Sequence, residues 1–125
     1  MVVYNAPFEQ SDHALRAAKT ALGMRKALAA FNDEQPVIPL EVRISIASGK
    51  AMVGDIGTTR RREFTVLGDV VNTAARIKGN ASPGQIVMSG ATAKQLPKEL
   101  AMNRIGMVAV RGRISEVEVF RLLEN

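Results

Sequence analysis

Residues 64–76 constrain the fold most, because strand periodicity changes to helix periodicity there within a few positions. The stretch opens with Phe-Thr-Val-Leu, which is typical of a strand, and continues through a Gly-Asp corner into a helix. Asp69 is expected to cap that helix, because its carboxylate can accept from backbone N–H groups left unpaired at the helix start. Asn72 and Arg76 are four positions apart and would share one helix face, while Thr65 lies on the preceding strand. The stretch therefore predicts three hydrogen-bonding side chains of different kinds where a strand passes into a helix.

The N-terminal half is expected to supply one long helix and several strands. Residues 1–4 have the composition of a short strand, and residues 11–31 have helical spacing with Ser11 or Asp12 as the cap. Alanines recur along the apolar side of that helix, which predicts close packing onto a sheet. Residues 41–48 alternate like a strand, and a tight Ser-Gly-Lys connection predicts a hairpin with residues 51–56.

The C-terminal half completes an α+β domain. After a polar excursion at 57–63 and the unit described above, we expect a strand at 85–88 and a helical turn or two at 91–96. Strands at 103–110 and 117–122 end the chain. The fold class is α+β, mostly antiparallel sheet with helices on one face, and residues 1–125 are expected to form a single domain.

Composition narrows the classes of function. The chain has 125 residues, no cysteine and a formal net charge of +5, with Arg60, Arg61 and Arg62 as its densest basic cluster. Basic charge fits nucleic acid, the phosphates of a nucleotide or an acidic partner surface, but the aromatic content of 4% leaves few side chains for stacking on bases. No apolar run approaches the roughly 20 residues of a membrane span. The N-terminal residues lack the basic leader of a signal peptide, so none is expected. We expect a cytoplasmic domain that binds no nucleic acid, and a membrane link only through upstream domains.

Four motifs and a basic linker between the first two, five pieces in register, resemble the catalytic domain of the class III nucleotidyl cyclases. The four motifs are Val-Gly-Asp-Ile-Gly at 53–57, Glu-Phe-Thr-Val-Leu-Gly-Asp-Val-Val-Asn-Thr-Ala-Ala-Arg at 63–76, Ala-Ser-Pro-Gly-Gln-Ile-Val-Met-Ser at 81–89 and Val-Arg-Gly-Arg at 110–113. The resemblance covers nearly the whole chain and about the C-terminal two-thirds of the family's domain. It implies a ferredoxin-like core whose N-terminal strands are missing here.

The resemblance implies specific roles for four residues. Asn72 would orient the ribose, and Arg76 would stabilise charge on the transferring phosphate. Thr65 falls where the family reads the purine, and Thr there is typical of bacterial adenylyl-type members. Arg111 stands where the family usually has a lysine that contacts the phosphates. Without the resemblance, Asn72 and Arg76 would be read as solvated helix residues.

The resemblance also implies partners and a metal requirement. ATP would be cyclised by a homodimer with shared active sites, and Arg60, Arg61 and Phe64 would lie on the arm that reaches across the dimer. The family uses Mg²⁺ or Mn²⁺ held by two aspartates on earlier strands, so this chain is expected to hold no metal ligand and to be inactive alone. Asp55 and Asp69 are not expected to form a metal pair, because Asp69 is accounted for as a cap and Asp55 stands where the family commonly has Asn.

The alternative functions are a guanylate cyclase, an inactive cyclase-like module that binds a nucleotide or partner, and, less favoured, a small RNA-binding domain.

Overall fold

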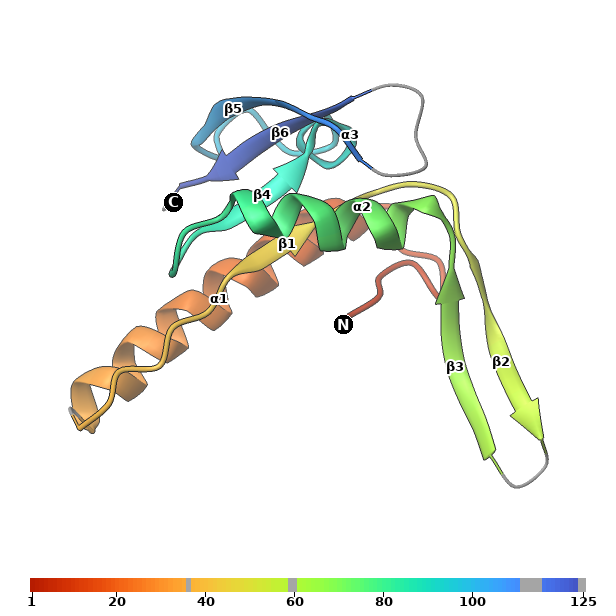
Figure 1. The fold of residues 1–125 in the computed structure, drawn as a ribbon, viewed down its shortest axis with the longest axis horizontal. Coiled ribbons are helices and arrows are strands. Elements are labelled where there is room, and N and C mark those ends of the chain that lie inside the picture. The colour runs from red at the N-terminus through yellow and green to blue at the C-terminus, as the bar shows by residue number, and fades with distance from the viewer. Residues whose placement is uncertain (36, 59–60, 111–115, 124–125) are drawn as a thin grey trace.

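A four-stranded sheet forms the centre of the protein, and a separate two-stranded hairpin projects from it (Figure 1). The computed structural model describes residues 1–35, 37–58, 61–110 and 116–123. The sheet contains β1 (Ile44–Ile46), β4 (Ile86–Ser89), β6 (Val117–Leu122) and β5 (Met102–Val108), side by side in that order. β1 runs parallel to β4, whereas β4 with β6 and β6 with β5 are antiparallel. The predicted α+β class with a mostly antiparallel sheet is confirmed.

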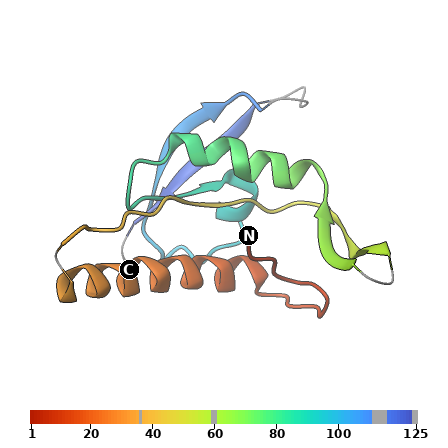
Figure 2. The ribbon, with the colours of Figure 1, turned by 60° about the horizontal axis from the view of Figure 1, so that its bottom comes forward.

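Two helices cover opposite faces of this sheet (Figure 2). On one face, α1 (His13–Glu34) packs with Ile86 and Met88 of β4. On the other, Ile77 at the end of α2 (Asp69–Ile77) joins a buried cluster with Val87 of β4. The expectation of helices on one face only is wrong. All four residues of β4 are buried, because the strand is covered from both sides.

The alanines of α1 allow the helix to lie close to the sheet, as predicted. Ala14, Ala18 and Ala21 are at most 3% exposed and recur on one side of the helix. The helix starts and ends later than the expected 11–31, and no side-chain cap closes it. Asp12 occupies the N-cap position, but its carboxylate instead accepts from Nε of Arg16 at 2.7 Å. The hydrogen bond from Arg16 lowers the pKa of that carboxyl.

The hairpin is made of β2 (Met52–Thr58) and β3 (Arg61–Leu67), which corrects two predictions. Its register runs from Met52 opposite Leu67 to Thr58 opposite Arg61. The described residues of the expected polar excursion, 57–58 and 61–63, thus belong to paired strands, and β1 pairs with β4 rather than with β2. Because parallel strands cannot be joined by a tight turn, the chain crosses from β1 to β4 by way of the hairpin and α2. We call β2 and β3 the arm.

Shorter segments complete the fold. Residues 1–4 form no strand, because their backbone pairs with none of the described strands; the hydroxyl of Tyr4 instead donates to Thr20 of α1. A 3₁₀ turn, η1 (Lys78–Asn80), follows α2, and α3 (Gly90–Ala93) follows β4. Within the described part of the chain, no helix has the length and apolar character needed to cross a membrane.

Candidate active site

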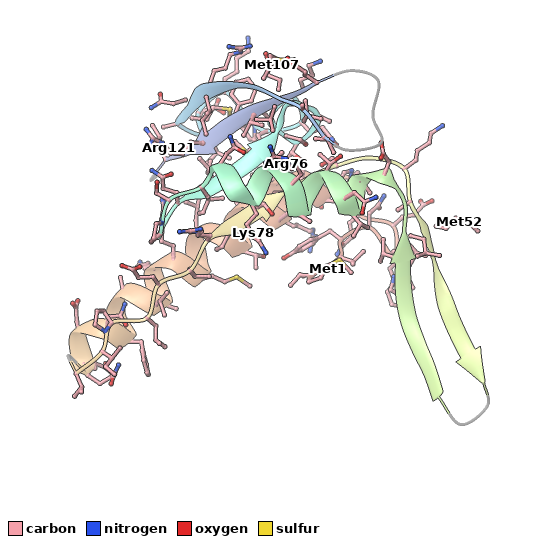
Figure 3. All side chains as sticks on the ribbon, in the orientation of Figure 1. Met1, Met52, Arg76, Lys78, Met107 and Arg121 are labelled. Atoms are coloured by element: carbon pink, nitrogen blue, oxygen red, sulfur yellow. The ribbon has the colours of Figure 1, made fainter. Side chains whose placement is uncertain are left out.

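Helix α2 presents Asn72 and Arg76 on its exposed side. Both residues are exposed, whereas Thr73 and Ile77, the residues that directly follow them, are only 3% and 0% exposed. The helix is therefore anchored by one face and offers an amide and a guanidinium, one turn apart, on the other. Figure 3 shows Arg76 on α2 and Met52 at the base of the arm.

The corner that starts α2 is built on Gly68, which corrects the predicted cap. Gly68 is the N-cap residue, with φ 154° and ψ 166°, and Asp69 is the first residue of the helix. The negative charge of Asp69 is still favourable there, because the first helical turn carries a partial positive charge. The Gly-Asp corner thus has the location predicted from the sequence, but the backbone of the glycine makes the turn.

The other predicted site residues are described in part or not at all. Thr65 lies on β3 opposite Gly54, three residues before the corner, and only its backbone is described. Arg61 and Phe64 also lie on β3 with their side chains outside the description. Arg60 and Arg111 fall outside the described residues. The structure therefore brings Asn72, Arg76 and the backbone of Thr65 to one strand–helix unit.

An open cleft of about 660 Å³ lies beside the first turn of α2. It is lined by the segment after β1, by α2, by α3 and by parts of β5 and β6, with Lys50, Lys94, Asp69, Glu116 and Glu118 as its charged residues. Asn72 and Arg76 are not among its lining residues. Lys50 and Lys94 could not be recognised from the sequence, because isolated surface lysines carry no pattern that separates them from solvated ones.

A second, shallower cleft of about 490 Å³ lies at the other end of α2. It is lined by Glu41, Val42, Arg43, Lys78 and Gly79. A Cβ on Gly79 would lie 3.6 Å from Nη1 of Arg76, so the guanidinium lies near this end of the helix. Arg43 and Lys78 were also not predicted as residues of a cleft, although Arg43 stands directly before the strand β1.

The described residues do not fit a divalent metal. Among them, no three His, Cys, Asp or Glu side chains lie close enough to hold an ion.

The sequence and the fold that carry this strand–helix corner and the projecting arm both match a known class of catalytic domains. Over residues 1–124 the chain matches the family described as "Adenylate and Guanylate cyclase catalytic domain", and it belongs to this family. The resemblance seen in the sequence is confirmed.

The relatives include cyclases for both nucleotides. The chain is 32% identical to "Adenylate cyclase 1" of Rhizobium meliloti over 126 residues, which cover 97% of this chain and 19% of that protein. It is 31% identical to "Guanylate cyclase soluble subunit beta-2" of Rattus norvegicus over 128 residues, covering 100% of this chain and 18% of the relative.

Among solved structures, the fold is similar to the adenylyl cyclase CyaB from P. aeruginosa, with a TM-score of 0.85 and 25% identity. That match covers 96% of this chain and 64% of the solved one. The chain thus spans about a fifth of the curated relatives named above and under two-thirds of this solved cyclase.

Proposed function

We propose that this chain supplies half of an adenylate cyclase active site, in which ATP is converted to 3′,5′-cyclic AMP and pyrophosphate for cyclic-nucleotide signalling. One observation carries the proposal: α2 is held by its buried face, at Thr73 and Ile77, and offers Asn72 and Arg76 together on its exposed face. Membership of the cyclase family supports this reading of the pair.

Each residue of the pair has a defined task in the proposed reaction. The ribose 3′-hydroxyl attacks the α-phosphate, and pyrophosphate leaves. The Asn72 amide donates to and accepts from the ribose, which keeps the attacking oxygen in line with the bond that breaks. Arg76 donates to the phosphate oxygens as negative charge grows on them in the transition state. Because that charge is larger in the transition state than in ATP, Arg76 lowers the barrier more than it tightens binding.

In this proposal the other half of each site comes from a second copy. Divalent ions, held by carboxylates outside this chain, neutralise charge on the phosphates when they are bound. The arm, with Arg60, Arg61 and Phe64, reaches to the partner, and Arg111 contacts the phosphates. The exposed Met52 and Leu67 at the base of the arm support a contact with another protein surface. The proposal places the domain in the cytoplasm, where ATP is plentiful.

The choice of ATP over GTP rests on Thr65, whose hydroxyl would read the purine. Guanylate cyclases are similar to this chain to nearly the same degree as adenylate cyclases. The test is to incubate the complete catalytic domain with Mn²⁺ and ATP or GTP, each alone, and to separate the products by chromatography. We expect cyclic AMP from ATP and little cyclic GTP. Cyclic GTP as the main product would make the domain a guanylate cyclase. If neither cyclic AMP nor cyclic GTP is formed, the result favours an inactive cyclase-like module.

The chain of 125 residues alone should make no cyclic nucleotide, because our proposal assigns the metal-binding carboxylates to residues outside it. If the chain alone forms more cyclic nucleotide than a blank without protein, that assignment is contradicted.

A further inference from the structure

We infer that Ser45 is a positioning residue for α2. Its side chain is half-buried on β1, and its hydroxyl donates to the backbone oxygen of Ala74 across 2.7 Å. Ala74 lies between Asn72 and Arg76 in the helix. The bond therefore fixes the helix at the turn that carries both proposed site residues. This inference rests on the proposed function, because a fixed pose matters only if the two side chains act on a substrate.

The bond from Ser45 holds a specific part of the helix. The oxygen of Ala74 also accepts from the backbone N–H of Lys78, the C-cap residue of α2. A helix carbonyl can accept two hydrogen bonds, so the serine adds a link to the sheet without breaking the helix. Burial of Ile77 and Thr73 holds the same side of α2 against the sheet, but apolar packing alone leaves a helix free to slide or rotate slightly. A directional hydrogen bond removes that freedom.

The segment that follows β1 makes a second contact with α2, at its first turn. A Cβ on Gly49 would lie 3.3 Å from Cβ of Val70 and 3.4 Å from its Cγ2, so the glycine backbone lies directly against the helix. Ser48 is held in turn, since its hydroxyl lies 2.8 Å from that of the buried Thr92 on α3. α2 is thus fixed at two points by one continuous stretch of chain, residues 45–49.

The two points lie about one turn apart on the helix, at Val70 and Ala74. Two contacts at that spacing define both the rotation and the axial position of α2, which a single contact cannot do. The reaction is sensitive to such a pose, because a shift of about 1 Å in a positioned group costs roughly 100-fold in rate.

The test compares Ser45→Ala with Ser45→Thr, which keeps the hydroxyl and suits a strand, and with Ser82→Ala, an exposed serine on the loop after α2. In the complete protein, hydrogen exchange of the α2 amides and the steady-state kcat and KM are measured for each. We expect Ser45→Ala to speed exchange in α2 by about 2- to 12-fold, which corresponds to the loss of one hydrogen bond. Its kcat should fall roughly 10- to 100-fold with KM within about twofold. Ser45→Thr and Ser82→Ala should match the wild type.

Three outcomes would overturn the inference: unchanged exchange in Ser45→Ala, faster exchange with unchanged kcat, or a Ser45→Thr protein as impaired as Ser45→Ala. If the wild-type protein makes no cyclic nucleotide, the proposed function fails, and exchange in α2 still decides whether Ser45 holds the helix.

Discussion

A Cβ on Gly68 would lie 3.0 Å from the backbone oxygen of Lys50. It would also lie 3.2 Å from Cα of Ala51, so two backbone segments meet there with no room for a side chain. Gly68 connects β3 to α2, and Ala51 directly precedes β2. Both strands of the arm therefore enter the body at this contact, next to the helix that carries the proposed site.

Gly68→Ala should destabilise the protein. The substitution forces a side chain onto a φ of 154° and against the oxygen of Lys50, and such strain costs roughly 1–3 kcal/mol in free energy of unfolding. Urea unfolding followed by circular dichroism measures the change. Gly54→Ala on the arm is the matched control, because a Cβ there would meet nothing within 4 Å. Equal stabilities for the two variants would contradict the close approach at Gly68.

Ala18→Leu should destabilise by about 1–3 kcal/mol, because the added atoms have no space between α1 and the sheet. Ala18 is 0% exposed within the cluster that contains Ile86 and Met88. Ala29→Leu, at an exposed position of the same helix, should be nearly neutral. A thermal melt of both variants separates the effect of packing from that of helix propensity. If Ala18→Leu melts with the wild type, α1 does not lie as close to the sheet as we describe.

The sequence predicted the strand–helix corner well, because its signals are local. A β-branched strand, a glycine and an amphipathic helix follow one another within residues 64–77, and Asn72 and Arg76 share the exposed face as their spacing requires. The strand at 117–122 was also predicted at its observed bounds, Val117–Leu122.

The pairing of strands and the layers could not be predicted in the same way. The arm contacts few other elements of this chain, and residues 57–63 show no apolar alternation that would mark a strand packed on the core. The Ser-Gly-Lys segment after β1 looks like a turn, yet it packs against α2 instead of joining a hairpin. One signal was overlooked: Ile86, Val87 and Met88 are consecutive apolar residues, which is typical of a strand covered on both faces. The clefts are formed by residues distant in sequence, which no local pattern brings together.

The arm should make the 125-residue chain associate. Met52 and Leu67 face each other across the base of the arm and are 76% and 52% exposed. Because an isolated two-stranded hairpin is marginally stable in water, we expect it to pack against a second copy. Light scattering at micromolar concentration should give a dimer or larger species. Met52→Lys combined with Leu67→Glu should shift the chain toward monomer with little change in its urea midpoint. A wild-type monomer at that concentration would contradict the proposed role of the arm.

Arg76→Ala and Asn72→Ala in the complete catalytic domain should lower kcat far more than they raise KM. Loss of one donor to a developing negative charge typically costs about 100- to 1000-fold in rate, or roughly 3–4 kcal/mol. Arg16→Ala, an exposed arginine on α1, is the control and should retain wild-type kinetics. A variant of either proposed residue with unchanged kcat and raised KM would assign that residue to ground-state binding instead.

The central claim is that α2 of one subunit completes a site whose metal-binding carboxylates belong to the other. It is tested most directly by mixing two inactive full-length domains, one with Arg76→Ala and one with a metal-binding carboxylate outside this chain replaced. In a heterodimer one of the two sites then has all its residues, so the account predicts that activity returns to as much as about one quarter of the wild-type value. A mixture as inactive as either parent, with heterodimers demonstrated by native mass spectrometry, would contradict the account.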